Sequence, residues 1–514
     1  MSSESLVLGI DAGTGGLRAC VFDVGGRLVA AAERSFSTQF PRPGWATQRP
    51  ADWWTALCEA TNEVIARGEI ASERIAGLAL DAPCDILLAD AAGTPTTDAL
   101  MWMDLRGARE ARALSATGDP VLRYCGGDVP AEWPLPKALW LKEHEPKLWS
   151  SSPRLVEQMT WLTWRLTGEW VAPLNSAAAK WHFRAGAAED AGWPRDLMRA
   201  AGLSDAEGKL PTRVVPMGGV AGTLTANAAH ALGLKMGTPV AMSGIDAHAG
   251  MIGVGVSAPG SVALITGTST CQLAQAASPV FDAGLWGPFE SAIVPDAWTI
   301  EAGQASTGGT VRWLMEMAGA RWPVEHRYAA ADAEAAAIAP GAGGLVLLDF
   351  WQGSRTPVKD PSARGTIWGL TNGHTAAHLL RAVYEGTAYG NRRILERLAT
   401  RGVSTTRIVA CGGGVRSALW LQILADVAGV PIEYTTSDDA VALGSAMCAA
   451  VGAGLYANIA AASAAMASTE RIVEPAATTT EQYARGFARY EATYAALAPL
   501  FASTDESYSG DAEL

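Results

Sequence analysis

Short apolar runs near the N-terminus alternate with turns that are rich in glycine. Residues 6–10, 17–23 and 27–32 are three such runs, and pairs of glycines lie in the turns between them. Apolar runs of this length bounded by glycine are typical of β-strands. The pattern therefore predicts a β-hairpin followed by a third strand.

Further along the chain, the sequence pattern predicts helices over residues 50–65, 376–400 and 417–428. A glycine lies beyond the end of each of these segments, as is common where a helix stops. Further short strands are expected at residues 75–80, 240–243 and 407–410.

The hairpin pattern returns near residue 260. Residues 261–266 and 270–274 are predicted strands around a Gly-Thr turn, in the same way that Gly13 and Thr14 lie in the turn of the first hairpin. Two copies of this unit, roughly half a chain apart, predict two related α/β domains that face a shared cleft.

The chain of 514 residues is acidic, with 39 Lys and Arg against 52 Asp and Glu and a net charge of −13. Its length favours about two to four domains, and a hydrophobic content of 49% supports a large core. The excess of acid argues against nucleic acid and anionic membranes as partners. The acidic charge does not exclude ATP as a ligand, because backbone N–H groups and magnesium hold phosphates locally. We therefore expect small-molecule partners.

Seven cysteines are scattered singly, without the spacing of a zinc site or a disulfide framework. The N-terminal segment lacks the basic start and the longer apolar stretch of a signal peptide. The Ala- and Gly-rich residues 441–466 favour buried helices over a membrane span, since both residue types contribute little transfer energy. We expect a cytoplasmic protein with reduced thiols.

The first candidate loop, GIDAGTGGLR at residues 9–18, leads from a strand into glycines and a hydroxyl. Its N–H groups can approach phosphate oxygens, while Asp11 could hold magnesium through water and Arg18 could screen phosphate charge. A hairpin turn capped by Asp explains the segment equally well. It is not a Walker loop, because G-x-x-x-x-G-K-S/T is absent.

Two more loops carry candidate chemistry. CGGGVRS at 411–417 joins a strand to a helix, where free N–H groups and the helix dipole suit a nucleotide. A tight connection without a ligand is the alternative, and the three consecutive glycines favour a ligand. SGIDAHAG at 243–250 places Asp246 after a strand among small residues, which suits a general base. On spacing alone a helix N-cap is the simpler role for Asp246, and His248 has no partner at the spacing of a catalytic triad.

Taken in order, these loops and the segments between them resemble the FGGY family of carbohydrate kinases over roughly residues 6–455. The matching segments are GIDAGT (9–14), WMDLR (102–106), PKALWLKE (136–143), LTGE (166–169), GIDAHAG (244–250), TGTS (266–269), EGTAYG (385–390), CGGGVRS (411–417), QILAD (422–426) and ALGSA (442–446).

The resemblance implies an α/β protein with two actin-like (RNase H-like) domains and the active site in the cleft between them. We place the N-terminal domain, with the sugar site and the phosphate hairpin, at residues 1–253, the nucleotide-binding domain at 254–502 and an acidic tail at 503–514. The implied reaction is transfer of the γ-phosphoryl group of ATP to a terminal hydroxyl of a sugar or polyol. Whether the chain forms a homodimer stays open.

The same resemblance implies roles for individual residues. Asp246 would be the catalytic base, and Asp11 and Asp246 would hold Mg²⁺. The expected nucleotide contacts are Gly13, Thr14, Arg18, Gly267, Thr268, Gly412, Gly413, Gly414 and Gly444.

Within the family the chain is most similar to ribulokinases, on the segments DAHAG (246–250), KWH (180–182), EAGQAS (301–306) and DFWQGSRTP (349–357). Xylulokinase-like members usually have Asn after the catalytic Asp. The implied substrate contacts are Lys180, Glu301 and Asp246, with Cys84 and Asp85 lining the wall after the strand at 75–80. An ammonium and two carboxylates can hydrogen-bond several hydroxyls at once.

Two segments depart from the ribulokinase pattern, DAPCD (81–85) and LVEQMT (155–160). Both lie on the sugar side, so they put the substrate in doubt rather than the chemistry. We expect an ATP-dependent kinase for a ketopentose, with D- or L-ribulose preferred. Xylulose, ribitol, erythritol and glycerol are alternative acceptors.

Two other functional classes compete with this hypothesis. An actin-like ATPase would use the same nucleotide cleft without phosphorylating a sugar. A catalytically silent sugar-binding relative is the third hypothesis, and the retention of Asp11, Thr14 and Asp246 argues against it.

Overall fold

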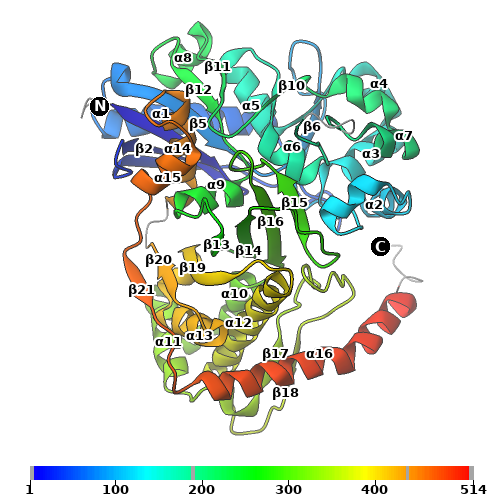
Figure 1. The fold of residues 1–514 in the computed structure, drawn as a ribbon, viewed down its shortest axis with the longest axis vertical. Helices are drawn as coiled ribbons and strands as arrows, with labels where there is room; N and C mark the ends of the chain where they lie inside the picture. Colours follow the sequence, from blue (N-terminus) through cyan, green and yellow to red (C-terminus); the bar gives the residue numbers. More distant parts are fainter. Residues whose placement is uncertain (1–4, 187–190, 436–438, 509–514) are drawn as a thin grey trace.

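The computed structural model describes residues 5–186, 191–435 and 439–508, and it shows two α/β halves, one above the other (Figure 1). Each half is built on one mixed β-sheet. The first sheet has the strand order β11-β12-β5-β1-β2-β3, and the second has the order β15-β16-β14-β13-β19-β20-β21. The two-domain α/β fold class that the sequence implied is confirmed.

Each large sheet contains the strands expected from the sequence together with strands that were not expected. Those of the first sheet are β1 (Leu6–Ala12), β2 (Gly16–Asp23), β3 (Leu28–Ser35), β5 (Ile75–Asp81), β11 (Val220–Thr223) and β12 (Pro239–Met242). Those of the second are β13 (Gly260–Thr266), β14 (Thr270–Ala276), β15 (Trp286–Glu290), β16 (Trp298–Gln304), β19 (Thr405–Gly412), β20 (Ile432–Tyr434) and β21 (Arg471–Val473). The N-terminal half adds a small sheet of β4 (Thr47–Gln48), β7 (Ala99–Leu100), β6 (Ile86–Ala89) and β8 (Arg154–Glu157).

The two large sheets repeat one topology. In the first, the antiparallel strands β3-β2-β1 continue into parallel β5 and β12. In the second, the antiparallel strands β16-β14-β13 continue into parallel β19 and β20. The internal repeat seen in the sequence is therefore a repeat of the whole strand arrangement. Loops that follow the parallel strands lie at one edge of each sheet, which is where ligands bind in such folds.

Helices cover both sheets. The N-terminal half contains α1 (Pro50–Arg67), α2 (Ala108–Ser115), α3 (Pro134–His144), α4 (Pro146–Ser151), α5 (Gln158–Thr167), α6 (Leu174–Lys180), α7 (Arg195–Ala200), α8 (Ala226–Leu232) and α9 (Asp246–Gly253). They are followed by α10 (Gly308–Met317), α11 (Arg327–Ala336), α12 (Ala376–Thr400), α13 (Ala418–Ala428), α14 (Ala440–Gly452), α15 (Ile459–Met466) and α16 (Thr480–Tyr508).

Helix boundaries agree with the sequence pattern in the C-terminal half. Helix α12 spans the predicted residues, and α13 begins one residue late because Ser417 is its N-cap, accepting the N–H of Trp420 at 3.1 Å. The segment expected to be a frayed tail is partly helical, since α16 continues to Tyr508. Residues 509–514 of that expected tail lie outside the described residues.

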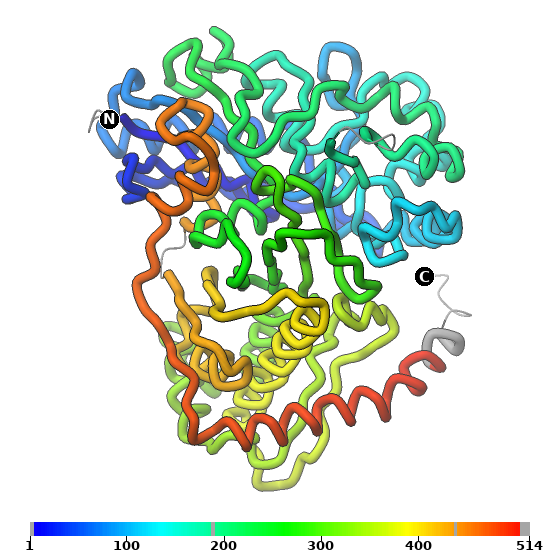
Figure 2. The backbone as a smooth tube through the Cα atoms, viewed as in Figure 1, coloured from blue at the N-terminus to red at the C-terminus, as the bar shows by residue number. Residues whose placement is uncertain are grey.

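Helix α14 comes late in the sequence but packs on the first sheet and on α9 (Figure 2). A Cβ atom on Gly444 would lie 1.9 Å from the carbonyl oxygen of Ala249, and one on Gly253 would lie 1.9 Å from that of Ala440. Only glycine fits at either position, because the two helix backbones touch there. The Ala- and Gly-rich segment thus forms buried helices. None of the helices in the described part of the chain has the length and apolar character that a membrane span requires.

Replacing Gly444 by Ala is expected to lower the free energy of unfolding by about 1–3 kcal/mol, because the added methyl group must push α14 away from Ala249. Thermal unfolding followed by circular dichroism measures the loss. Gly208→Ala is the control, since a Cβ atom there meets nothing within 4 Å. Equal melting temperatures for Gly444→Ala and the wild type would contradict the close helix contact.

Candidate functional site

Three carboxylates lie at the ends of neighbouring strands of the first sheet. Asp11 and Asp81 are paired across the parallel strands β1 and β5, so their side chains project from the same face. Asp246 follows β12 and is the first residue of α9, and its Oδ1 accepts the N–H of Ala247 at 2.7 Å. The N-cap of α9 is Ile245, so the capping role that spacing alone favoured for Asp246 is wrong by one position.

Burial and mutual repulsion raise the pKa values of these carboxyls. Burial, together with the charge of Asp246, raises the pKa of Asp11 to about 7. Burial and the charge of Asp11 hold the pKa of Asp81 well above its usual range, and burial also raises the pKa of Asp246. Ser445 donates to one oxygen of Asp81 at 2.6 Å, while the other oxygen has no partner among the described residues. Such a donor set fits Mg²⁺, which prefers oxygen ligands and would offset the repulsion.

A buried ion pair connects the two halves of the molecule. Lys180, the last residue of α6, donates to both carboxylate oxygens of Glu301 in β16, at 2.7 and 2.9 Å. Burial alone would raise the pKa of Glu301, but Lys180 and His248 outweigh it and bring that pKa to about 2. The pair is therefore ionised at neutral pH. Its donors and acceptors are of the kind that sugar hydroxyls use.

His248 holds the carboxylate of Glu301 from another side. The Nε2 atom of His248 lies 3.3 Å from Glu301 Oε2, and its Nδ1 atom lies 2.9 Å from the amide nitrogen of Asn175. The imidazole is fully buried, and the Asn175 amide group also accepts the N–H of Ile245 at 2.8 Å. His248 thus positions Glu301 next to the start of α9.

The two residues expected on the sugar wall differ in their placement. Cys84 lies close enough to Glu157, Lys180 and Asp246 for their charges to act on its thiol, whose pKa burial raises. Asp85 is fully buried and accepts the backbone N–H of Trp102 at 2.6 Å. The Oδ2 atom of Asp85 has no hydrogen-bond partner among the described residues, and a contact between Asp85 and the substrate stays a prediction.

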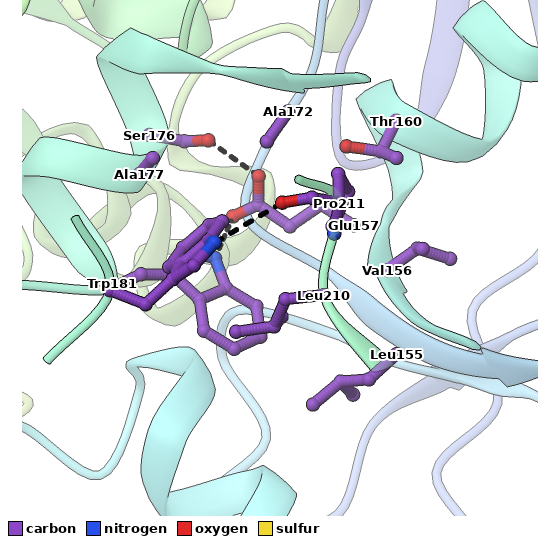
Figure 3. Close-up of a pocket in the computed structure, with 11 residues that line it drawn as sticks. Leu155, Val156, Glu157, Thr160, Ala172, Ser176, Ala177, Trp181, Leu210 and Pro211 are labelled. Atoms are coloured by element: carbon purple, nitrogen blue, oxygen red, sulfur yellow. Dashed lines mark hydrogen bonds between the residues drawn. The ribbon is translucent and has the colours of Figure 1, made fainter. Parts of the chain in front are cut away.

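Glu157 is hydrogen-bonded to two residues of the segment that carries Lys180 (Figure 3). Its two carboxylate oxygens accept hydrogen bonds from Ser176 Oγ at 2.5 Å and from Trp181 Nε1 at 2.8 Å. Burial raises the pKa of Glu157. Ser176 and Trp181 lie in and just after α6, so Glu157 fixes the turn of chain that presents Lys180.

The phosphate hairpin keeps its predicted residues together near Asp11. Thr14 lies in the turn between β1 and β2, and its Oγ1 accepts the indole N–H of Trp102 at 3.0 Å. Arg18 is paired with Asp11 across the hairpin, but its Nε donates to Asp439 at 2.5 Å. Asp439 is the residue before α14, so this ion pair joins the first hairpin to a segment from the second half of the chain. A phosphate contact by Arg18 stays a prediction.

The two loops of the second half that are expected to contact the nucleotide lie side by side. Thr266 and Gly412 are paired across the parallel strands β13 and β19, and Thr266 Oγ1 accepts the N–H of Gly414 at 3.0 Å. Gly412 has a φ of 93°, and a Cβ atom there would lie 2.0 Å from the carbonyl oxygen of Thr266. The exposed Gly413 and the exposed turn at 267–268 present backbone groups at this edge, which suits a nucleotide.

Helix packing explains why residue 444 is glycine. It is buried in the contact between α14 and α9, where packing alone requires glycine. The expected contact between Gly444 and the nucleotide base is therefore not needed to account for this residue.

The geometry agrees with comparisons to known proteins. Residues 6–253 match the N-terminal domain, and residues 262–453 the C-terminal domain, of the FGGY family of carbohydrate kinases. The chain belongs to this family. It is an ATP-dependent carbohydrate kinase, as the sequence predicted.

Relatives of this kinase match it over nearly its whole length. The FGGY carbohydrate kinase domain-containing protein of Xenopus laevis is 31% identical over 92% of the chain and 93% of the relative. A ribulokinase of Geobacillus thermodenitrificans is 30% identical over 88% of the chain and 86% of the relative. Among solved structures, xylulose kinase from Rhodospirillum rubrum has a TM-score of 0.85 and 28% identity, covering 96% of the chain and 99% of its own.

Several residues of the candidate site were not predicted from the sequence. A signal for Asp81 existed, because it ends the strand at 75–80 in the same way that Asp11 follows the first strand. Ser445 and Trp102 lay within quoted segments, but nothing in their spacing marked their contacts with Asp81 and Thr14.

Asp11→Asn is expected to raise the free energy of unfolding at pH 8 by about 1–2 kcal/mol, after allowance for solvent screening. The folded pKa of Asp11, about 7, lies above its unfolded value of 3.8, so the wild type loses stability as the pH rises between them. The gain should therefore shrink as the pH falls toward 4. Melting temperatures of the wild type and Asp11→Asn between pH 4 and pH 8, without divalent cations, measure this gain in stability. A difference between the wild type and Asp11→Asn that does not change with pH would contradict the raised pKa of Asp11.

Proposed function

We propose that this kinase transfers the γ-phosphoryl group of ATP to a terminal hydroxyl of a ketopentose, with ribulose preferred. The buried pair of Lys180 and Glu301 beside Asp246 carries the proposal. Its ammonium can donate to one sugar oxygen and its carboxylate can accept from another, while Asp246 meets the reacting hydroxyl. The ribulokinases among the relatives, at about 30% identity, support the same substrate class.

Asp246 acts as the base. Its raised pKa brings it closer to neutrality than that of a solvated carboxylate, which favours proton transfer from the attacking hydroxyl. Lys180 and Glu301 orient the sugar so that this hydroxyl faces the phosphate hairpin. Thr14 and the neighbouring glycines would contact phosphates from the first half, and Gly413 with the turn at 267–268 would contact the nucleotide from the second.

A magnesium ion would add to the contacts that the protein makes with the phosphate groups of ATP. Asp11, Asp81 and Asp246 are the residues that would hold Mg²⁺, and the unpartnered oxygen of Asp81 is available for it. When bound, Mg²⁺ supplies positive charge that offsets the phosphate oxygens. Closure of the two halves around the substrates would exclude water, so that ATP reaches the sugar and is not hydrolysed.

A second candidate substrate is xylulose. The solved xylulose kinases share the whole fold, with 28% identity for the enzyme of Rhodospirillum rubrum. The residue after Asp246 is Ala in this chain, which favours ribulose over xylulose by resemblance to the ribulokinase loop.

Asp246→Asn is expected to lower kcat by a factor of about 10² to 10⁴, because the amide cannot accept the proton, while the KM for the sugar changes little. A coupled assay that detects ADP measures both constants. Asp296→Asn is the matched control, since Asp296 is exposed and has a φ of 59° that Asn tolerates. Turnover of Asp246→Asn near that of the control would remove Asp246 from the role of base.

A panel of D-ribulose, L-ribulose, D-xylulose, ribitol, erythritol and glycerol tests the substrate. We expect the highest kcat/KM for one ribulose enantiomer, with the product's phosphate at a terminal carbon by NMR. A higher kcat/KM for xylulose would select the second candidate. ATP consumption that no acceptor stimulates would instead favour an actin-like ATPase.

A further inference from the structure

Two buried ring nitrogens near the Lys180–Glu301 pair have no hydrogen-bond partner in the described part of the chain. They are Nε2 of His182 and Nε1 of Trp286, in side chains that are 2% and 7% exposed. Buried polar groups in folded proteins are nearly always paired, because an unpaired group costs free energy. Both rings lie beside Trp133, with centroids 5.1 Å and 6.1 Å from the centroid of its indole, so one ligand at this indole can supply both missing partners.

The arrangement of strands places Trp286 beside the sugar site. Trp286 in β15 is directly opposite Glu301 in β16, so both side chains project from the same face of the second sheet. The ammonium nitrogen of Lys180 lies 5.1 Å from the ring centroid of Trp286 and 5.1 Å from that of Trp133. The indole of Trp286 therefore forms one side of the space around the ion pair.

His182 approaches from the first half of the molecule. It lies two residues after Lys180, and its ring centroid is 5.1 Å from that of Trp133. The backbone of His182 has a φ of 56°, a left-handed conformation that non-glycine residues seldom adopt and that often occurs at functional sites. The ring of His182 thus packs beside the indole of Trp133, which also lies next to the ammonium group of Lys180.

The chemistry of these groups matches a neutral polyhydroxylated ligand. Burial lowers the pKa of His182 to about 4, so its ring is uncharged at neutral pH and offers no countercharge to an anion. Lys180 is already neutralised by Glu301. The faces of Trp133 and Trp286 provide apolar surface for the C–H groups of a sugar.

We propose that His182 and Trp286 are specificity-determining residues, whose Nε2 and Nε1 atoms hydrogen-bond to the sugar oxygens beyond those held by Lys180 and Glu301. The proposal rests on the proposed function, in which Asp246 meets the reacting hydroxyl. A ketopentose has oxygens for all of these groups. Glycerol is too short to reach the last two, so His182 and Trp286 select for chain length.

Trp286→Phe and His182→Asn test the proposal. Trp286→Phe keeps an aromatic ring and removes only the N–H, and Asn suits the left-handed backbone at position 182 but is too short to replace Nε2. Each variant should raise the KM for the ketopentose about tenfold, as expected for one lost hydrogen bond, with kcat within about twofold. Neither should change kcat/KM for glycerol.

His182→Gln is the rescue variant, because its side-chain amide reaches the position of Nε2 and should recover most of the affinity. Trp298→Phe is the matched control for Trp286→Phe. Trp298 is on the same strand as Glu301, but its side chain packs against the core of the second half. The KM of Trp298→Phe for the ketopentose should therefore equal that of the wild type.

Calorimetric titration of each variant with the ketopentose, without ATP, separates this inference from the proposed function. If the wild type phosphorylates no sugar, the proposed function is wrong. If the wild type phosphorylates a ketopentose and Trp286→Phe and His182→Asn bind it with unchanged affinity, only the present inference is wrong. Equal losses for glycerol and ketopentose would also overturn it, since they would show a general disturbance of the site.

Discussion

The contact between α9 and α14 is the constraint on which the rest of the site depends. The backbones of these helices touch at Gly253 and Gly444, and α14 in turn lies against Gly9 of β1, where a Cβ atom would be 1.9 Å from the carbonyl oxygen of Ala442. Because α9 begins with Asp246, this packing fixes the proposed base relative to the strand that leads to Asp11. Glycine and alanine are needed here for close approach, not for flexibility.

The second determinant is the ion pair that crosses between the two halves. Lys180 comes from a helix of the first half and Glu301 from a strand of the second, so the pair forms only when both halves are correctly placed. Buried pairs of this kind contribute little net stability, since desolvation offsets most of their attraction. The ion pair instead provides polar groups in fixed positions. His248 contacts Glu301 directly, and Glu157 holds the end of the helix that carries Lys180.

Local structure was predictable where it depends on neighbouring residues. The spacing of apolar residues defined α12 and the first hairpin, and strand ends rich in glycine marked the loops around Asp246 and Gly413. Contacts between distant segments were not predictable. Nothing near Asp85 in the sequence indicates that it turns inward to the backbone of Trp102, and nothing near Arg18 indicates Asp439 as its partner. Both depend on how the loops fold over one another in three dimensions.

Two thiols near the Lys180–Glu301 pair bear on the chemical sensitivity of the candidate site. Burial holds the pKa values of Cys84 and Cys271 well above the usual range, and both residues lie near the Lys180–Glu301 pair. Alkylating agents and disulfides react with the thiolate, not with the thiol. At neutral pH the two sulfur atoms are therefore protonated thiols, which behave as small apolar and polarisable groups. Cysteines at these two positions are therefore expected to react slowly with alkylating agents and disulfides at neutral pH.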